Sequence, residues 1–175
     1  MKIKDKEFVP FIGEAELAAT VDRLAAEVNR DYQGRSLTVC PVLTGAFMFA
    51  TDLVRRLTVD AEMRFVKYAS YDGMCSTGSV RCQLPFPDSL AGKDVLVVED
   101  VVDSGLSMQH LLAELRKLGP RSVRLCALFF KPGAFRGDYR VDYVGREIGN
   151  EFIVGYGMDY DECGRCLPAV WVVDE

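Results

Sequence analysis

Three acidic residues lie close together in the stretch VLVVEDVVDSGLSM, which covers residues 95–108. Glu99, Asp100 and Asp103 fall within five residues, directly after the apolar run Val95–Val98. Their negative charges should repel one another unless a ligand or a cation lies among them. Carboxylate oxygens are the ligands that Mg²⁺ prefers, and they also accept hydrogen bonds from sugar hydroxyls. We therefore expect Glu99 and Asp100 to hold a metal ion, a sugar, or both.

The acidic stretch passes into a turn of small residues that could bind a phosphate. The residues of this turn are Asp103, Ser104, Gly105, Leu106 and Ser107. Small side chains let backbone N–H groups approach an anion, and the helix that follows presents its N-terminus. A substrate with a phosphate and vicinal hydroxyls, arriving with Mg²⁺, would fit both features. The alternative is that Asp103 and Ser104 only cap the helix and that Glu99 and Asp100 are solvated at a strand end.

The rest of the chain predicts the scaffold that carries this stretch. Apolar residues three and four apart predict helices, and continuous apolar runs predict strands. Helices are expected over residues 14–30, 46–57 and 108–118, and strands over 36–43, 61–70, 94–99 and 122–130. Apolar strands separated by amphipathic helices are typical of a parallel sheet covered on both faces. We predict an α/β fold with a parallel sheet flanked by helices, and one domain covering residues 1–175.

Several polar segments should meet at one edge of this sheet. In open α/β sheets, ligands bind beyond the carboxyl ends of the strands. Thr44-Gly45, residues 99–107 and Lys131 all follow predicted strands. Residues 138–175 have short strand candidates and no clear helix, so we expect them to form a small hood over the same edge.

Composition narrows the function. The net charge is −5 and the pI is near 5.0, with scattered basic residues, which argues against nucleic-acid binding. The charged N-terminus does not resemble a signal peptide, and no apolar window has the length of a membrane span, so a cytoplasmic protein is expected.

Cys163 and Cys166 have C-x-x-C spacing, but the single histidine, His110, is far away in the sequence. A structural zinc site needs four ligands, so we expect reduced thiols.

The stretch 95–108 resembles the phosphoribosyl-diphosphate (PRPP) binding signature of type I phosphoribosyltransferases. That signature is a buried strand with two acids, two apolar residues, and then Asp-[Ser/Thr]-Gly-x-[Ser/Thr]. Further matches, from about residue 38 to 168, narrow the resemblance to the hypoxanthine and hypoxanthine-guanine phosphoribosyltransferases. The matching residues are Leu43, Thr44 and Gly45 in the first active-site loop, Ser70 and Tyr71 at the start of the lid, Lys131, Tyr143 and Val144 around the purine, and Arg165 at the pyrophosphate.

The resemblance implies a reaction: a 5-phosphoribosyl group moves from PRPP to a purine nitrogen and pyrophosphate is released. Asp103 would act as general base at purine N7, and Glu99 and Asp100 would hold Mg²⁺ and the ribose hydroxyls. Lys131 would donate a hydrogen bond to the 6-oxo oxygen, Tyr143 would stack on the base, and Val144 would contribute backbone groups only. Arg165 would stabilise the leaving pyrophosphate. The family also suggests a homodimer or homotetramer.

Three positions depart from the family pattern, and one of them is Arg146, at a position that is often aromatic. Thr44 stands where the family usually has lysine, but that loop works mainly through its backbone, often with a cis peptide bond. We therefore expect PRPP binding to be weakened rather than lost. Asn150 stands where the family commonly has an aspartate, thought to ligate a second Mg²⁺, and an amide oxygen is a poorer ligand for a hard cation.

Other functions are compatible with the same fold. One is a nucleotide-sensing regulator that binds RNA, which should have a basic face that this acidic chain does not suggest. Another is an α/β nucleotide-binding module without transferase chemistry. The glycine motifs of dinucleotide-binding domains and of P-loop proteins are both absent from the sequence. Their absence weighs against a dinucleotide-binding module and against a P-loop module.

Overall fold

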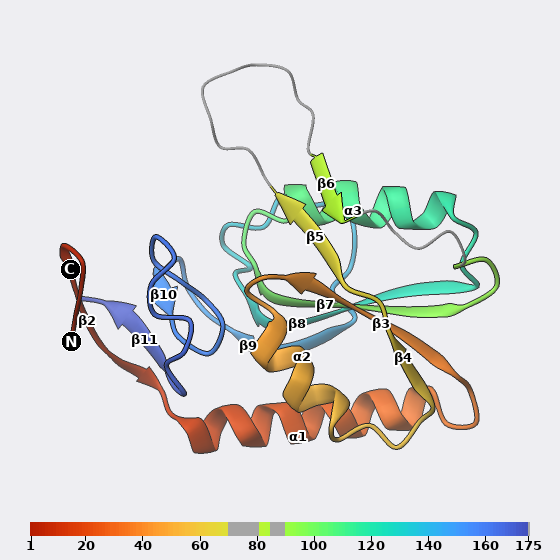
Figure 1. The fold of residues 1–175 in the computed structure, drawn as a ribbon, viewed down its shortest axis with the longest axis horizontal. Helices are drawn as coiled ribbons and strands as arrows, with labels where there is room; N and C mark the ends of the chain where they lie inside the picture. Colours follow the sequence, from red (N-terminus) through yellow and green to blue (C-terminus); the bar gives the residue numbers. More distant parts are fainter. Residues whose placement is uncertain (70–80, 85–89, 175) are drawn as a thin grey trace.

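The computed structural model describes residues 1–69, 81–84 and 90–174. In these ranges the chain forms a main sheet with helices on both faces and a smaller antiparallel sheet at one end (Figure 1). The helices are α1 (Glu14–Asp31), α2 (Phe47–Val54) and α3 (Leu106–Lys117). The strands of the main sheet are β3 (Leu37–Leu43), β4 (Ala61–Met63), β5 (Val66–Ala69), β6 (Arg81–Leu84), β7 (Asp94–Val102), β8 (Ser122–Phe130) and β9 (Tyr143–Glu147). The small sheet contains β1 (Lys2–Ile3), β2 (Lys6–Ile12), β10 (Ile153–Val154) and β11 (Val170–Val173).

The main sheet has the strand order β6-β5-β3-β7-β8-β9, with β4 also paired to β3. All of these pairs are parallel except β5 with β6. The central strands β7 and β8 pair over their whole length, from Asp94 opposite Ser122 to Val102 opposite Phe130. The predicted parallel α/β sheet is therefore confirmed, and its most buried strands are the ones that the continuous apolar runs predicted.

Alternate side chains of the central strands pack into two separate cores. Leu96 and Val98 of β7 face α1 and α2. Val95 and Val97 of the same strand face α3. Figure 1 shows α3 and α1 on opposite sides of the sheet. The side-chain period of two in a strand produces this division, and both cores hold β7 rigidly up to its carboxyl end.

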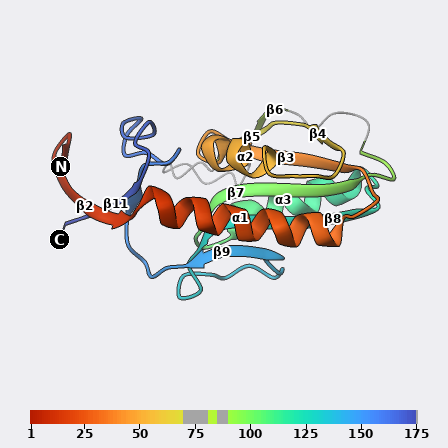
Figure 2. The same cartoon turned by 90° about the horizontal axis from the view of Figure 1, so that it is seen from below.

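The small sheet joins the two ends of the chain. β2 pairs with β11, and β11 pairs with β10, all antiparallel. Figure 2 shows this sheet beyond one end of the main sheet, with both termini nearby. The expected hood is thus present, but residues 138–175 do not all belong to it, because β9 pairs with β8 and lies in the main sheet. The helices in the described ranges are too short or too polar to cross a membrane.

Candidate active site

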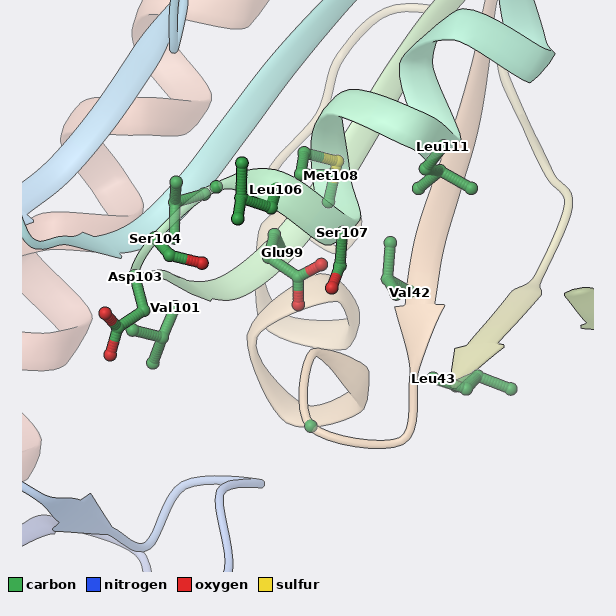
Figure 3. Close-up of a pocket in the computed structure, with 13 residues that line it drawn as sticks. Val42, Leu43, Glu99, Val101, Asp103, Ser104, Leu106, Ser107, Met108 and Leu111 are labelled. Carbon is green, nitrogen blue, oxygen red and sulfur yellow. The ribbon is translucent and has the colours of Figure 1, made fainter. Parts of the chain in front are cut away.

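A pocket of about 630 Å³ opens where β3 and β7 end and α3 begins (Figure 3). Leu43 and Gly45 line one side of it, and Glu99 and the 103–107 turn line the other. This is the carboxyl edge of a parallel sheet, where such folds bind ligands. The pocket therefore lies at the place that the strand ends predicted.

Glu99 and Asp100 lie within β7, which continues to Val102, past the strand end expected at residue 99. The backbone N–H of Asp100 donates to Oε1 of Glu99 over 3.2 Å, and that of Val101 donates to Oδ1 of Asp100 over 2.9 Å. None of the ion pairs within the described ranges includes Glu99 or Asp100. Burial, followed by the negative charge of Asp100, raises the pKa of Glu99 well above its usual value. Within the ranges that the structure describes, no lysine or arginine therefore relieves the repulsion between these two acids.

The 103–107 turn forms the start of α3. Gly105 is the N-cap residue and has a φ of +77°, which glycine adopts without the steric cost other residues have. The helix begins at Leu106, whose side chain is 50% exposed, so it is not held in the core. Figure 3 shows the carboxylate of Glu99 and the hydroxyl of Ser107 pointing to the same side, below the start of α3. The turn thus combines a helix N-terminus with hydroxyl groups beside a carboxylate.

Asp103 is bonded to Lys131 across the end of the sheet. Lys131 follows β8 directly, and its Nζ lies 2.8 Å from Oδ2 of Asp103. The lysine is 7% exposed, whereas the aspartate side chain is 56% exposed. The structure therefore brings a proton donor and a proton acceptor together at Asp103, which lines the pocket.

The first loop predicted to bind the substrate lies at the end of β3. The peptide bond between Leu43 and Thr44 is cis, as the resemblance suggested, and the Thr44 side chain is exposed. A Cβ placed on Gly45 would lie 1.8 Å from Oδ2 of Asp100. The turn therefore packs its backbone directly against the second of the two acids in β7.

Arg165 reaches the same turn through the C-terminal segment. Its Nη1 donates to the carbonyl of Gly157 over 3.0 Å, and a Cβ on Gly157 would lie 2.1 Å from the carbonyl oxygen of Gly45. Its Nη2 lies 2.9 Å from Oδ1 of Asp159. Sequence reasoning missed Asp159, although it is an acidic residue next to a glycine-containing turn and within the stretch that carried the resemblance.

Tyr143 and Val144 are not brought into the pocket. Tyr143 is 3% exposed and pairs with Cys126, five residues or roughly 16 Å along β8 from Lys131. Its hydroxyl is bonded to Asp31 and Arg124 at the opposite end of the sheet, and the Val144 carbonyl accepts a hydrogen bond from α1. Neither residue can contact a base held at Lys131. The expected stacking role of Tyr143 and backbone role of Val144 were therefore wrong.

An exposed aromatic residue lies in a better position than Tyr143. Ile148 N donates to the carbonyl of Phe130, which places the segment after β9 along the carboxyl end of β8. Phe152 follows on this segment, and its side chain is 44% exposed. Its ring contacts those of Phe8 and Tyr160. Sequence reasoning missed Phe152, which lies directly before β10.

The remaining predicted residues divide into exposed and undescribed positions. Asn150 is exposed, with its Oδ1 3.9 Å from the place of a Cβ on Gly133. Ser70 and Tyr71 lie outside the described residues. Cys163 and Cys166 are free and exposed, and the described ranges contain no group of three or more His, Cys, Asp or Glu residues arranged to hold a metal ion.

Comparison with known proteins agrees with this geometry. A sequence model of the phosphoribosyl transferase domain matches residues 13–161. A hypoxanthine-guanine phosphoribosyltransferase of Mycobacterium tuberculosis is 39% identical over 166 residues, which cover 91% of this chain and 82% of the relative.

Two solved structures have the same architecture. The chain is similar to a hypoxanthine-guanine phosphoribosyltransferase of Bacillus anthracis, with a TM-score of 0.90 and 35% identity over 97% of this chain and 99% of that one. It is also similar to a hypoxanthine phosphoribosyltransferase of Staphylococcus aureus, with a TM-score of 0.90 and 32% identity over 97% and 92% of the two chains. On the domain match, the shared sequence and the shared fold together, the chain belongs to the phosphoribosyltransferase family, in its hypoxanthine and hypoxanthine-guanine branch.

Proposed function

We propose that the protein transfers the 5-phosphoribosyl group of PRPP to hypoxanthine and guanine in purine salvage, giving IMP or GMP and pyrophosphate. The observation that carries this proposal is the pair of Asp103 and Lys131 beside the 103–107 turn, with 2.8 Å between Oδ2 and Nζ. In a 6-oxopurine with a proton on N7, the 6-oxo oxygen accepts a hydrogen bond and N7–H donates one, and the two groups are adjacent. A lysine beside a carboxylate offers the complementary donor and acceptor.

This pairing assigns the first chemical steps. Asp103 accepts the N7 proton, which increases the electron density on the ring nitrogen that attacks the sugar. Lys131 donates to the 6-oxo oxygen, where negative charge develops as the proton leaves. Adenine carries an amino group at this position, which is itself a donor, so it is disfavoured. We propose that Phe152, in place of Tyr143, supplies an aromatic face for the base.

The sugar and its phosphate would occupy the other half of the pocket. The 5-phosphate lies in the 103–107 turn, where backbone N–H groups and the α3 N-terminus favour an anion. Glu99 and Asp100 face the ribose hydroxyls. As the anomeric bond breaks, the sugar gains positive charge, and the two carboxylates provide a negative field beside it. Arg165, with the turn around the Leu43–Thr44 bond, holds the pyrophosphate that leaves.

Members of this family use a metal ion in catalysis, and we propose Mg²⁺ for this chain. The donor set fits, because Mg²⁺ is commonly bound by one or two carboxylates together with substrate phosphates and water. Glu99 and Asp100 would hold it, while Asn150 is exposed and neutral and is a poor second ligand. Bound Mg²⁺ would neutralise charge on the departing pyrophosphate.

The direct test is turnover. Purified protein with MgCl₂ and PRPP should convert hypoxanthine and guanine to their nucleotides, with adenine giving no product and an Asp103→Ala variant as the inactive control. Binding of PRPP with no product from any 6-oxopurine would refute the proposal and favour a nucleotide-sensing regulator. We further propose a cytoplasmic homodimer or homotetramer, for which light scattering on the purified protein would give the mass.

A further inference from the structure

The loop between β8 and β9, residues 131–142, folds back onto the 103–107 turn. The backbone N–H of Arg136 donates to the carbonyl of Ser104 over 2.9 Å, and the hydroxyl of Tyr139 donates to the carbonyl of Gly105 over 3.0 Å. Asp138 N also donates to Oε1 of Gln109 on α3 over 3.0 Å. Hydrogen bonds thus join the 103–107 turn and the start of α3 to a segment that is distant in the sequence.

Packing fixes the Tyr139 ring in this position. Its centroid lies 5.1 Å from that of Phe135, with an interplanar angle of 85°, and Phe135 in turn contacts Phe130. A Cβ on Gly105 would lie 2.5 Å from Phe135 and 2.7 Å from the Tyr139 hydroxyl. A Cβ on Gly137 would lie 2.4 Å from the Tyr139 ring. Two glycines therefore leave the space in which the ring and its hydroxyl approach the turn.

These contacts orient two peptide groups. In a trans peptide, the C=O and N–H bonds point in opposite directions. The carbonyl of Ser104 is held by the 131–142 loop, and that of Gly105 accepts both the Tyr139 hydroxyl and the first hydrogen bond of α3, from Gln109 N over 2.9 Å. The N–H groups of Gly105 and Leu106 therefore point away from the loop. Gly105 and Leu106 line the pocket, whereas Phe135 and Tyr139 do not. The N–H groups are therefore held on the side where the phosphate would bind.

We infer that Tyr139 is a positioning residue for the phosphate: its hydroxyl holds the Gly105–Leu106 peptide so that the Leu106 N–H faces the 5-phosphate of the substrate. The inference rests on the proposed function, because it assumes that the turn binds that phosphate. Burial, with the charge of Glu99 adding to it, raises the pKa of Tyr139 above its usual value. The hydroxyl thus remains a donor at neutral pH. The same loop begins with Lys131, so it connects the base side of the pocket to the phosphate side.

Replacing Tyr139 with phenylalanine removes the hydroxyl and keeps the ring. The KM for PRPP should rise about fivefold, the effect of losing one neutral hydrogen bond, and the inhibition constant of IMP should rise by a similar factor. The KM for hypoxanthine should stay the same, because the base contacts Lys131 and Asp103. A purely structural role would change both substrates together or lower the melting temperature.

Two further variants separate this inference from others. Tyr156→Phe removes a hydroxyl bonded to Asp52 over 2.6 Å, outside the pocket walls, and should leave both KM values unchanged. Gly137→Ala displaces the Tyr139 ring without removing its hydroxyl and should raise the KM for PRPP as Tyr139→Phe does. If the wild type is active and Tyr139→Phe leaves the KM for PRPP unchanged, or raises both KM values equally, the inference is wrong and the proposed function stands. An inactive wild type would instead overturn the proposed function.

Discussion

Replacing Gly45 with alanine should disrupt the site without unfolding the protein. A Cβ at position 45 would lie 1.8 Å from Oδ2 and 2.6 Å from Cγ of Asp100, whereas Cβ contacts under 3.0 Å essentially do not occur. Either the carboxylate or the turn must therefore move by at least about 1.2 Å, which is the difference between 3.0 Å and 1.8 Å. Both are parts of the proposed PRPP site, so the geometry of that site must change.

The size of the effect follows from this displacement. A shift of about 1 Å in a positioning group can lower the rate about 100-fold, equivalent to about 2.7 kcal/mol of transition-state stabilisation. Gly45 does not have a positive φ, so alanine itself adds no backbone strain. Relieving the overlap with Asp100 should lower the free energy of unfolding by about 1–3 kcal/mol, as overpacking typically does. The expected result is therefore a large loss of kcat/KM for PRPP in a protein that stays folded and melts at a somewhat lower temperature.

The assay compares kcat/KM for PRPP and thermal unfolding of the wild type, Gly45→Ala and a matched control. Gly13→Ala is that control, because the nearest atom to its added Cβ is Oε2 of Glu16, at 3.9 Å. It should retain the activity of the wild type. A folded Gly45→Ala variant whose kcat/KM stays within about threefold of the wild type would show that the contact with Asp100 does not matter for the reaction.

Three other changes test separate parts of the molecule. Asp103→Asn should lower kcat by about 100-fold or more with little change in the KM for PRPP, since general-base catalysis contributes roughly 10²–10⁴; equal losses in steady-state kinetics would mean that Asp103 is structural. Asp94→Asn should lower the free energy of unfolding in urea by about 2 kcal/mol, because Asp94 is 1% exposed and hydrogen-bonded to Arg121, which holds its pKa below the usual value. That contribution should be complete above about pH 4 and lost as the pH falls through the lower folded pKa, so a difference unchanged at the acid end would contradict it. The double variant Cys163→Ser/Cys166→Ser should keep full activity with or without a zinc chelator, and a loss that zinc restores in the wild type would reveal a metal site.

The sequence predicted those features whose signals are local. The apolar runs placed β3, β7 and β8, and β8 agrees in both bounds with the prediction. The acids at the end of β7 were found because charged residues directly after a buried run are unusual without a ligand. Lys131 was found by its position directly after a predicted strand, together with the family resemblance. In each case a few neighbouring residues contain all the information.

Features that depend on distant pairing could not be predicted in the same way. The small sheet needs β2 from the N-terminus beside β11 from the C-terminus, and neither strand has a pattern that identifies its partner. Tyr143 and Phe152 are both aromatic residues near short strand candidates, so the sequence cannot say which ring is exposed. Burial decides it: Tyr143 is 3% exposed and hydrogen-bonded in the interior, and Phe152 is 44% exposed. The hydroxyl of Tyr139 likewise reaches Gly105 across 34 residues.

Two acids on the same strand, Asp94 buried and Glu99 half-buried, show how the fold separates structural charge from functional charge. Asp94, at the start of β7, is hydrogen-bonded to Arg121 and Ser122, and its pKa is lowered. Glu99, five residues further on, has no cation partner within the described ranges, and its pKa is raised. The strand and its packing are common to both, so the backbone does not cause the difference. Pairing an acid with a cation, as at Asp94, stabilises the protein. An acid without such a partner, like Glu99, destabilises the free protein. That cost is reasonable only where a ligand supplies the missing positive charge or hydroxyl donors, so we propose that the carboxyl end of β7, and not its start, binds the substrate.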